Sequence, residues 1–202
     1  MQIKFEEITS VFENDISGNA GIIKEGSGIL ILSGKNTYTG ENVINGGELR
    51  VTGEVASQVK INNGGIFTTD GGTVANNVIN NSGNFRNIGN GGVITGDYTA
   101  DNNSVLENEL GAELRIKGRV FLGNSKLKIL IPDGKENNYG YISETGRKNK
   151  IIKADMGISD NFGEVEVPEL LIPELKYGES YVELDIKRKD VSEYAAAAYS
   201  LD

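Results

Sequence analysis

Short segments of alternating apolar and polar residues recur along the first half of the chain, each led by a glycine. They read GILILSG, GELRVTG, GIFTTDG and GNFRNIG, and their leading glycines are 18 or 19 residues apart. An alternation of period two indicates β-strands with one buried face. The second residue after the glycine is large and apolar in every copy, so the same face is buried each time: Leu30, Leu49, Phe67 and Phe85.

A second pattern comes just before each glycine, in VINGG, KINNGG and VINNSG. An isoleucine and the asparagine after it keep the same place in each copy, as Ile44–Asn45, Ile61–Asn62 and Ile79–Asn80. A unit of two short strands that repeats at this period cannot bury its apolar face alone, so the copies must stack as coils of a solenoid. We expect interior columns of Leu and Phe, and amide ladders of Asn at the turns.

The alternation continues after Asp97, although the turns become longer and more charged. The expected buried positions there are Leu114, Ile116, Val120, Leu122, Leu127, Ile129 and Ile131. A last strand sets Val182, Leu184 and Ile186 against Tyr181, Glu183 and Asp185, and two of the three prolines lie shortly before it. Proline suits an edge strand that ends further pairing.

These patterns predict an all-β fold: a right-handed, single-stranded parallel β-helix with a carboxy-terminal β cap. We expect four parts. Residues 1–15 form a lead-in, 16–97 form regular coils, 98–189 form the last coils and the cap, and 190–202 form either a short Ala-rich helix or a frayed terminus.

The composition of the chain argues against several classes of function. The 29 acidic against 20 basic residues give a net charge of −9, which argues against a nucleic-acid partner. The absence of cysteine fits export through an oxidising compartment. No run approaches the roughly 20 apolar residues of a membrane helix. The amino terminus lacks the pattern of a signal peptide, and we expect the chain to be part of a longer protein.

The chain contains neither His nor Cys, which excludes Ser–His–Asp and Cys–His catalysis and His- or thiolate-based metal sites. Asp70, Asp97 and Asp101 are scattered beside glycine or asparagine, so we interpret them as solvated turn residues and not as a polysaccharide-cleaving cluster. The glycine pairs 71–72 and 91–92 are interpreted as corners, because no phosphate-binding lysine follows. We therefore expect no catalytic residue, no metal and no cofactor.

Two features of the sequence each allow a structural and a functional interpretation. The basic run Lys187, Arg188 and Lys189 either lies near lipid headgroups or is a solvated strand end, and the second interpretation is favoured. Four tyrosines gather in the expected cap, where packing is favoured over carbohydrate stacking: Tyr139, Tyr141, Tyr177 and Tyr181.

Residues 16–51 resemble the passenger-associated repeat of autotransporter proteins. The residues that carry the resemblance are Gly21, Ile22, Lys24, Gly26, Gly28, Leu30, Leu32, Ser33, Gly34, Asn36, Thr37, Tyr38, Thr39 and Gly40. The departures are Ile22 in place of Leu and Glu41 where a further Gly is common. Downstream, GDYTADNNSVLENEL and LRIKGRVFLGNSKLKI resemble the segment before the cap of pertactin-like passengers. YISETGRKNKIIKADMGISDNFGEV resembles that cap, which is called the autochaperone region.

The resemblance implies a non-enzymatic structural stem and autochaperone segment of a secreted passenger, exported through the periplasm and outer membrane to the cell surface. It further implies that the stem displays an upstream adhesin or virulence domain. A covalently linked β-barrel translocator and, through the parent passenger, host or bacterial surface receptors are the partners it implies. The alternative is that the β-helix face is itself an adhesin that binds host or bacterial surface ligands.

Overall fold

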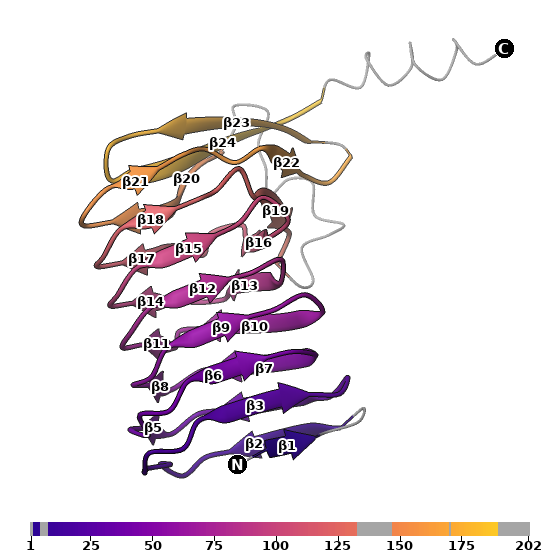
Figure 1. The fold of residues 1–202 in the computed structure, drawn as a ribbon. Coiled ribbons are helices and arrows are strands. Elements are labelled where there is room, and N and C mark those ends of the chain that lie inside the picture. Colours follow the sequence, from indigo (N-terminus) through magenta and orange to yellow (C-terminus); the bar gives the residue numbers. More distant parts are fainter. Residues whose placement is uncertain (1, 5–7, 133–146, 170, 190–202) are drawn as a thin grey trace, which may run out of the picture.

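The chain winds into a stack of coils, most of which contribute one short strand to each of three sheets (Figure 1). The computed structural model describes residues 2–4, 8–132, 147–169 and 171–189. These residues form 24 strands and no helix. The stack rises along one axis from the amino-terminal strands to a cap of longer strands (Figure 1).

Each sheet has eight strands in the described residues. Sheet A consists of β1 (Gln2–Lys4), β3 (Ile22–Glu25), β6 (Asn42–Ile44), β9 (Val59–Ile61), β12 (Val78–Asn80), β15 (Tyr98–Ala100), β18 (Val120–Phe121) and β21 (Ile158–Ser159). Sheet B consists of β2 (Thr9–Phe12), β4 (Ile29–Leu32), β7 (Gly47–Val51), β10 (Gly65–Asp70), β13 (Asn84–Ile88), β16 (Val105–Glu109), β19 (Lys126–Leu130) and β22 (Glu164–Glu166). Sheet C consists of β5 (Lys35–Asn36), β8 (Glu54–Val55), β11 (Thr73–Val74), β14 (Val93–Ile94), β17 (Leu114–Ile116), β20 (Arg147–Ala154), β24 (Tyr181–Arg188) and β23 (Leu171–Tyr177).

One interior column runs through six strands of sheet B, from β4 to β19. Parallel pairing places its members directly above one another, and all are fully buried: Leu30, Leu49, Phe67, Phe85, Leu106 and Leu127. The rings of Phe67 and Phe85 are 5.3 Å apart between centroids, and Phe85 is 5.5 Å from Tyr98. The predicted column is therefore confirmed, and it continues two coils beyond the repeat.

The neighbouring interior column is apolar at both ends and polar in the middle. In register it contains Leu32, Val51, Thr69, Asn87, Asn108 and Ile129. Thr69 Oγ1 donates to Asn87 Oδ1 at 3.1 Å, and Asn87 Nδ2 donates to Asn108 Oδ1 at 2.8 Å. Asn108 Nδ2 in turn donates to the carbonyl of Ala112 at 3.0 Å. The buried amides are thus paired across coils, which offsets the cost of taking them out of water.

The predicted alignment of Ile79 and Asn80 is wrong by one residue. Asn80 pairs with Ile61 and is buried, whereas Ile79 pairs with Lys60 and is half-buried. The corner after Ile61 holds three residues before its leading glycine, and the corner after Asn80 holds two. An alignment based on distance from the glycine therefore shifts the strand, and a shift of one residue reverses which side chains face inward.

The amide ladder forms between two of the three predicted asparagines in the described structure. Asn62 Nδ2 donates to Asn45 Oδ1 at 2.7 Å on the outside of the corner. Asn80 instead points inward, where its Oδ1 accepts the N–H of Gly83 at 3.0 Å.

The cap reverses the direction of the chain in sheet C. β20 lies parallel to β17, β24 pairs antiparallel with β20, and β23 pairs antiparallel with β24. Val182, Leu184 and Ile186 are fully buried, as predicted. Pro173 lies on β23, the outermost strand, where a missing N–H costs least. The predicted parallel β-helix with a carboxy-terminal β cap is confirmed.

Asp185 departs from the predicted alternation. Asp185 is only 6% exposed. Its neighbours Leu184 and Ile186 face the interior, so the alternation predicts an exposed residue between them. It lies on β24, the central strand of the cap, between Lys148 on β20 and Glu174 on β23. The predicted helix at residues 190–202 lies outside the described residues.

The revised register can be tested by alanine substitution. Ile61→Ala is expected to lower the free energy of unfolding by about 2–5 kcal/mol, because it leaves a cavity in a closed interior column. Ile79→Ala is the matched control and should cost about 1 kcal/mol or less, because that side chain is half-buried. Urea unfolding followed by circular dichroism gives both values, and equal losses would contradict the register.

Candidate functional site

Several buried polar side chains lie in or next to the segment that resembles the passenger repeat. They are almost completely excluded from solvent: Lys24, Asn36, Tyr38, Asn42 and Ser57. Burying such groups is costly unless each finds a partner. Their partners therefore show what the repeat does in the fold.

Lys24 on β3 holds its ammonium group among backbone carbonyls. Nζ donates to the carbonyls of Glu25 at 3.0 Å, Gly26 at 3.1 Å and Gly46 at 3.1 Å. Gly26 and Gly46 belong to successive coils, so one side chain joins the two. Burial lowers the pKa of Lys24. Gly47 is required beside it, because a Cβ there would lie 2.4 Å from the carbonyl oxygens of Gly26 and Gly28.

Asn36 on β5 connects three successive coils. Its Oδ1 accepts the N–H of Ile16 at 3.2 Å from the coil below. Its Nδ2 donates to Gly34 O at 3.0 Å in its own coil and to Glu54 O at 3.1 Å in the coil above. A single amide therefore satisfies backbone groups that the corner leaves unpaired.

Tyr38 begins a short hydrogen-bonded chain between two coils. Its hydroxyl donates to Asn42 Oδ1, and Asn42 Nδ2 donates to Ser57 Oγ at 2.9 Å. Burial raises the pKa of Tyr38 to about 12, although the hydrogen bonds with Asn42 and Ser57 oppose the rise. The phenol therefore stays neutral and keeps its donor proton at physiological pH.

The three aspartates singled out in the sequence do not meet. Asp70 is the last residue of β10, Asp97 precedes β15 and Asp101 follows it, so they lie at three different corners of the coil. Asp97 Oδ1 accepts the N–H of Arg119 at 2.7 Å, and Asp70 Oδ1 accepts that of Asn90 at 3.4 Å. All three are half-buried, and each accepts a backbone N–H from an adjacent coil.

Asp101 has the densest set of donors. Ser104 Oγ donates to its Oδ1 at 2.7 Å, and Ser82 donates through Oγ at 2.9 Å and through its backbone N–H at 3.1 Å. Burial raises the pKa of Asp101, but the hydrogen bonds from Ser104, Ser82 and the backbone outweigh it and lower the pKa below 3.8. The carboxylate therefore stays ionised and stabilises the corner.

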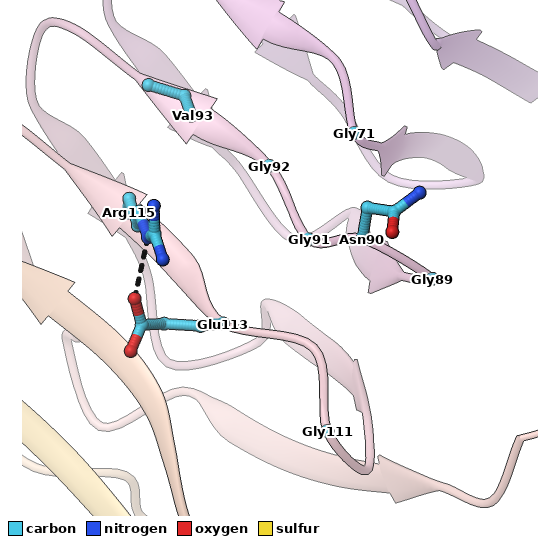
Figure 2. A pocket seen from close by; sticks show the side chains of 9 residues that line it. All are labelled: Gly71, Gly89, Asn90, Gly91, Gly92, Val93, Gly111, Glu113 and Arg115. Atoms are coloured by element: carbon cyan, nitrogen blue, oxygen red, sulfur yellow. Dashed lines mark hydrogen bonds and ion pairs between the residues drawn. The ribbon is translucent and has the colours of Figure 1, made fainter.

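A hollow of about 430 Å³ lies at the corner between sheets B and C (Figure 2). Glycines, Asn90, Val93 and the ion pair of Glu113 with Arg115 (2.7 Å) line it. A Cβ on Gly91 would lie 2.2 Å from the carbonyl of Glu113, so tight coil stacking requires glycine there. The corner interpretation of glycines 71–72 and 91–92 is confirmed. Among the described residues, no three His, Cys, Asp or Glu side chains are grouped to hold a metal ion.

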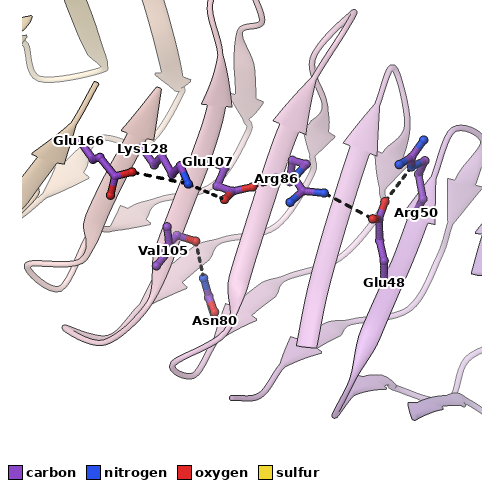
Figure 3. A network of polar contacts seen from close by, with 8 residues as sticks. All are labelled: Glu48, Arg50, Asn80, Arg86, Val105, Glu107, Lys128 and Glu166. Carbon is purple, nitrogen blue, oxygen red and sulfur yellow. Dashed lines mark hydrogen bonds and ion pairs between the residues drawn. The ribbon is translucent and has the colours of Figure 1, made fainter. Parts of the chain in front are cut away.

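A ladder of charged side chains crosses the outer face of sheet B (Figure 3). Arg86 lies at its centre and contacts Glu107 at 2.6 Å and Glu48 at 3.4 Å. The ladder continues through Glu48–Arg50 at 2.8 Å, Lys128–Glu107 at 3.8 Å and Lys128–Glu166 at 3.5 Å. The side chains of Glu48 and Glu107 are only 7% and 9% exposed, so these pairs are screened less than ordinary surface pairs. Sequence reasoning missed the ladder because most of its pairs join different coils, which only the stacking brings together.

Two of the four tyrosines make contacts within the cap. The Tyr177 hydroxyl accepts the N–H of Phe162 at 3.1 Å, and Lys150 Nζ lies 5.2 Å from the centre of the Tyr181 ring. Tyr139 and Tyr141 lie outside the described residues.

In the basic run, Lys187 and Arg188 are exposed at the end of β24, as a solvated strand end requires. Across the residues that the structure describes, no helix has the length and apolar character needed to cross a membrane.

Four of these five buried polar residues lie in a segment that matches a known family. The passenger-associated transport repeat matches residues 22–51, which include Lys24, Asn36, Tyr38 and Asn42. The Neisserial autotransporter lipoprotein NalP of Neisseria meningitidis is 30% identical over 155 residues, which cover 73% of this chain and 14% of that protein. The chain is an autotransporter passenger region.

Two further relatives agree with this assignment over shorter stretches. An extracellular serine protease of Serratia marcescens is 45% identical over 60 residues, covering 30% of this chain and 6% of that protein. The adhesin BmaC autotransporter of Brucella suis is 30% identical over 96 residues, covering 45% of this chain and 3% of that protein. The passenger region therefore spans a small part of the length of the curated relatives it matches. The predicted location is confirmed, since such passengers are secreted or exposed at the surface through the outer membrane.

The structure explains which polar residues the passenger repeat needs. Lys24, Asn36 and Asn42 each bond across adjacent coils of the passenger, and none of them faces solvent. The polar residues of the repeat therefore form buried contacts that fix the position of one coil on the next.

Lys24→Met tests this role, because methionine keeps the apolar length and removes the donors. We expect the free energy of unfolding to fall by about 1–3 kcal/mol, the cost of leaving buried carbonyls without a partner. Lys117→Met, at an exposed position, should change it little. Urea unfolding of both variants gives the comparison, and a Lys24→Met chain at least as stable as the parent would show that burying the charge costs more than its bonds return.

Asp101→Asn tests the acid dependence of the corner. A pKa that is lower in the folded than in the unfolded chain adds stability above the unfolded value of 3.8, and this stability is lost as the pH falls through the folded pKa. The variant should therefore be less stable than the parent at neutral pH, and the difference should shrink in acid below 3.8. Thermal unfolding across this pH range measures it, and a difference that is independent of pH would contradict the assignment.

Proposed function

We propose that this passenger region is a structural stem and autochaperone segment, which promotes passenger folding and outer-membrane secretion and displays an upstream adhesin or virulence domain at the cell surface. The observation that carries the proposal is the cap, in which two antiparallel strands close the parallel stack of sheet C.

The hairpin β23–β24 suits a segment that folds early. Its strands are joined by a tight turn in which the N–H of Gly178 donates to the carbonyl of Tyr181 at 2.9 Å. Contacts between residues close in sequence form faster than contacts between distant coils. Once β24 pairs with β20, the other edge of β20 offers residues 152–154, with which β17 pairs in parallel.

Stacking on a formed edge is also favourable in energy. A lone coil leaves its apolar face in water, whereas a coil laid on a formed neighbour buries it at once. Growth from the carboxy-terminal end would therefore proceed coil by coil and oppose retreat of the chain through the secretion pore. Residues 98–189 would supply the template, 16–97 the coils that follow, 1–15 the lead-in, and 190–202 the link to a covalently attached β-barrel translocator in the whole protein.

We further propose that the region is not itself an enzyme. The aspartates that could act as acids accept backbone N–H groups instead. The match to a serine protease covers 6% of that protein, and the present chain has no histidine for a Ser–His–Asp triad.

The alternative is that the β-helix face is an adhesin. The match to the adhesin BmaC autotransporter over 45% of the chain favours it. The charged ladder on sheet B is an ordered face that host or bacterial surface ligands could contact.

The stem proposal is tested in the parent autotransporter. Val182→Ala with Leu184→Ala weakens the cap, and Leu30→Ala with Leu32→Ala removes comparable buried groups from an early coil. Each pair should destabilise the purified chain by several kcal/mol. We expect the cap pair to reduce surface display and protease resistance several-fold more than the early pair, because only the cap is needed to start stacking.

Equal secretion of the two double variants would contradict a special role for the cap. The adhesin alternative is tested separately, by measuring binding to cells. Binding of host or bacterial cells by the purified chain supports it, and binding by the full passenger alone assigns adhesion to other segments.

A further inference from the structure

The corner between β9 and β10 carries an Asn–Gly pair at its tip. The N–H of Gly65 donates to the carbonyl of Asn62 at 2.9 Å, which closes a four-residue turn around Asn63 and Gly64. Gly64 has a φ of 88°, as the third position of a type II turn requires. This corner is the one with the extra residue that shifts the alignment of Ile79.

Asn–Gly pairs have a chemistry of their own. The backbone nitrogen of the glycine attacks the side-chain Cγ of the asparagine, a C–N bond forms, and the side-chain amide leaves as ammonia. Water then opens the resulting five-membered succinimide at either carbonyl, which yields aspartate or isoaspartate. The reaction consumes only water, and it needs a glycine nitrogen and an asparagine side chain that are free to approach each other.

The chain has three such pairs, at 45–46, 63–64 and 90–91, and all lie at described corners. The fold places each of the three pairs in a different environment.

Asn90–Gly91 is held most firmly. Gly91 is buried, and its N–H donates to the carbonyl of Ile88 at 2.9 Å. The N–H of Asn90 lies 3.4 Å from Asp70 Oδ1. Reaction there requires the corner to open first.

Asn45–Gly46 is held on both sides of the reacting atoms. The Asn45 Oδ1 accepts a hydrogen bond from Asn62 Nδ2 at 2.7 Å. The carbonyl of Gly46 accepts one from Lys24 Nζ at 3.1 Å. Rotation of this asparagine therefore breaks the ladder between the two corners.

Asn63–Gly64 has neither restraint. Both residues are exposed, and within the described residues no hydrogen bond engages the Asn63 side chain or the Gly64 N–H. A Cβ built on Gly64 meets a single atom within 4 Å, the Asn45 carbonyl oxygen at 3.6 Å. The turn tip has room to move while the strands on either side stay paired.

We propose that Asn63 is a site of non-enzymatic deamidation in the folded chain. The modification places a carboxylate on the outside of the A–B corner, beside the Asn45–Asn62 ladder. The interior columns are unaffected, because the turn tip contributes no side chain to them. The proposal is independent of the stem function.

The experiment uses the purified full-length chain kept at mildly alkaline pH and sampled over time. Trypsin separates the three pairs, because cleavage after Lys35, Arg50, Lys60, Arg86 and Arg115 places each in its own peptide. Mass spectrometry then gives the fraction of aspartate and isoaspartate at each site. A parallel incubation in denaturant gives the rate of each pair without the fold.

We expect Asn63 to react in the folded chain at nearly its denatured rate and at least about tenfold faster than Asn90, which corresponds to about 1.4 kcal/mol of local opening at the protected corner. Asn63→Gln should abolish the product in the peptide of residues 61–86, which also contains other asparagines. Circular dichroism should show that this variant keeps the parent fold.

The proposal is overturned if Asn45 or Asn90 reacts as fast as Asn63 in the folded chain. It is also overturned if folding slows Asn63 by tenfold or more, or if the product in the peptide of residues 61–86 persists in the Asn63→Gln variant.

Discussion

Parallel pairing in register between one coil and the next is the constraint on which the rest of the structure depends. It sets Leu30, Leu49 and Phe67 above one another and continues that column to Leu127. A column of this kind is buried only when both neighbours are present, so no coil is stable by itself. Every polar group inside the stack must then find its partner within its own coil or in the coils next to it.

Four buried polar residues, Asn87, Asn108, Lys24 and Asn36, meet this condition in two ways. Asn87 and Asn108 repeat at one interior position and bond to each other, so they add a directional contact to a column that apolar residues could otherwise occupy in several registers. Lys24 and Asn36 occur once each and satisfy backbone groups at the corners, where strand pairing ends. Apolar residues therefore drive the stacking, and polar residues specify which coil lies on which.

Much of the fold could be predicted because the pattern of inward and outward residues is local. The column of Phe67 and Phe85 and the buried positions of β24, at Val182, Leu184 and Ile186, follow from counting residues along a strand. Features that depend on the number of residues in a corner could not be predicted in this way. The inward position of Asn80 and the Arg119 N–H accepted by Asp97 appear only when the coils are stacked. Lys24 is recognisable in the repeat motif, but a lysine on a strand gives no sign that its ammonium group lies among carbonyls.

The corner between β9 and β10 holds one more residue than the next corner along the stack, yet the strands on both sides keep their pairing. Strand length is therefore fixed by the neighbours, whereas corner length is free to change. Insertions and deletions in evolution can accumulate at such corners without disturbing the core. The same freedom makes this corner a place where a foreign peptide can be grafted without disturbing the stacked coils.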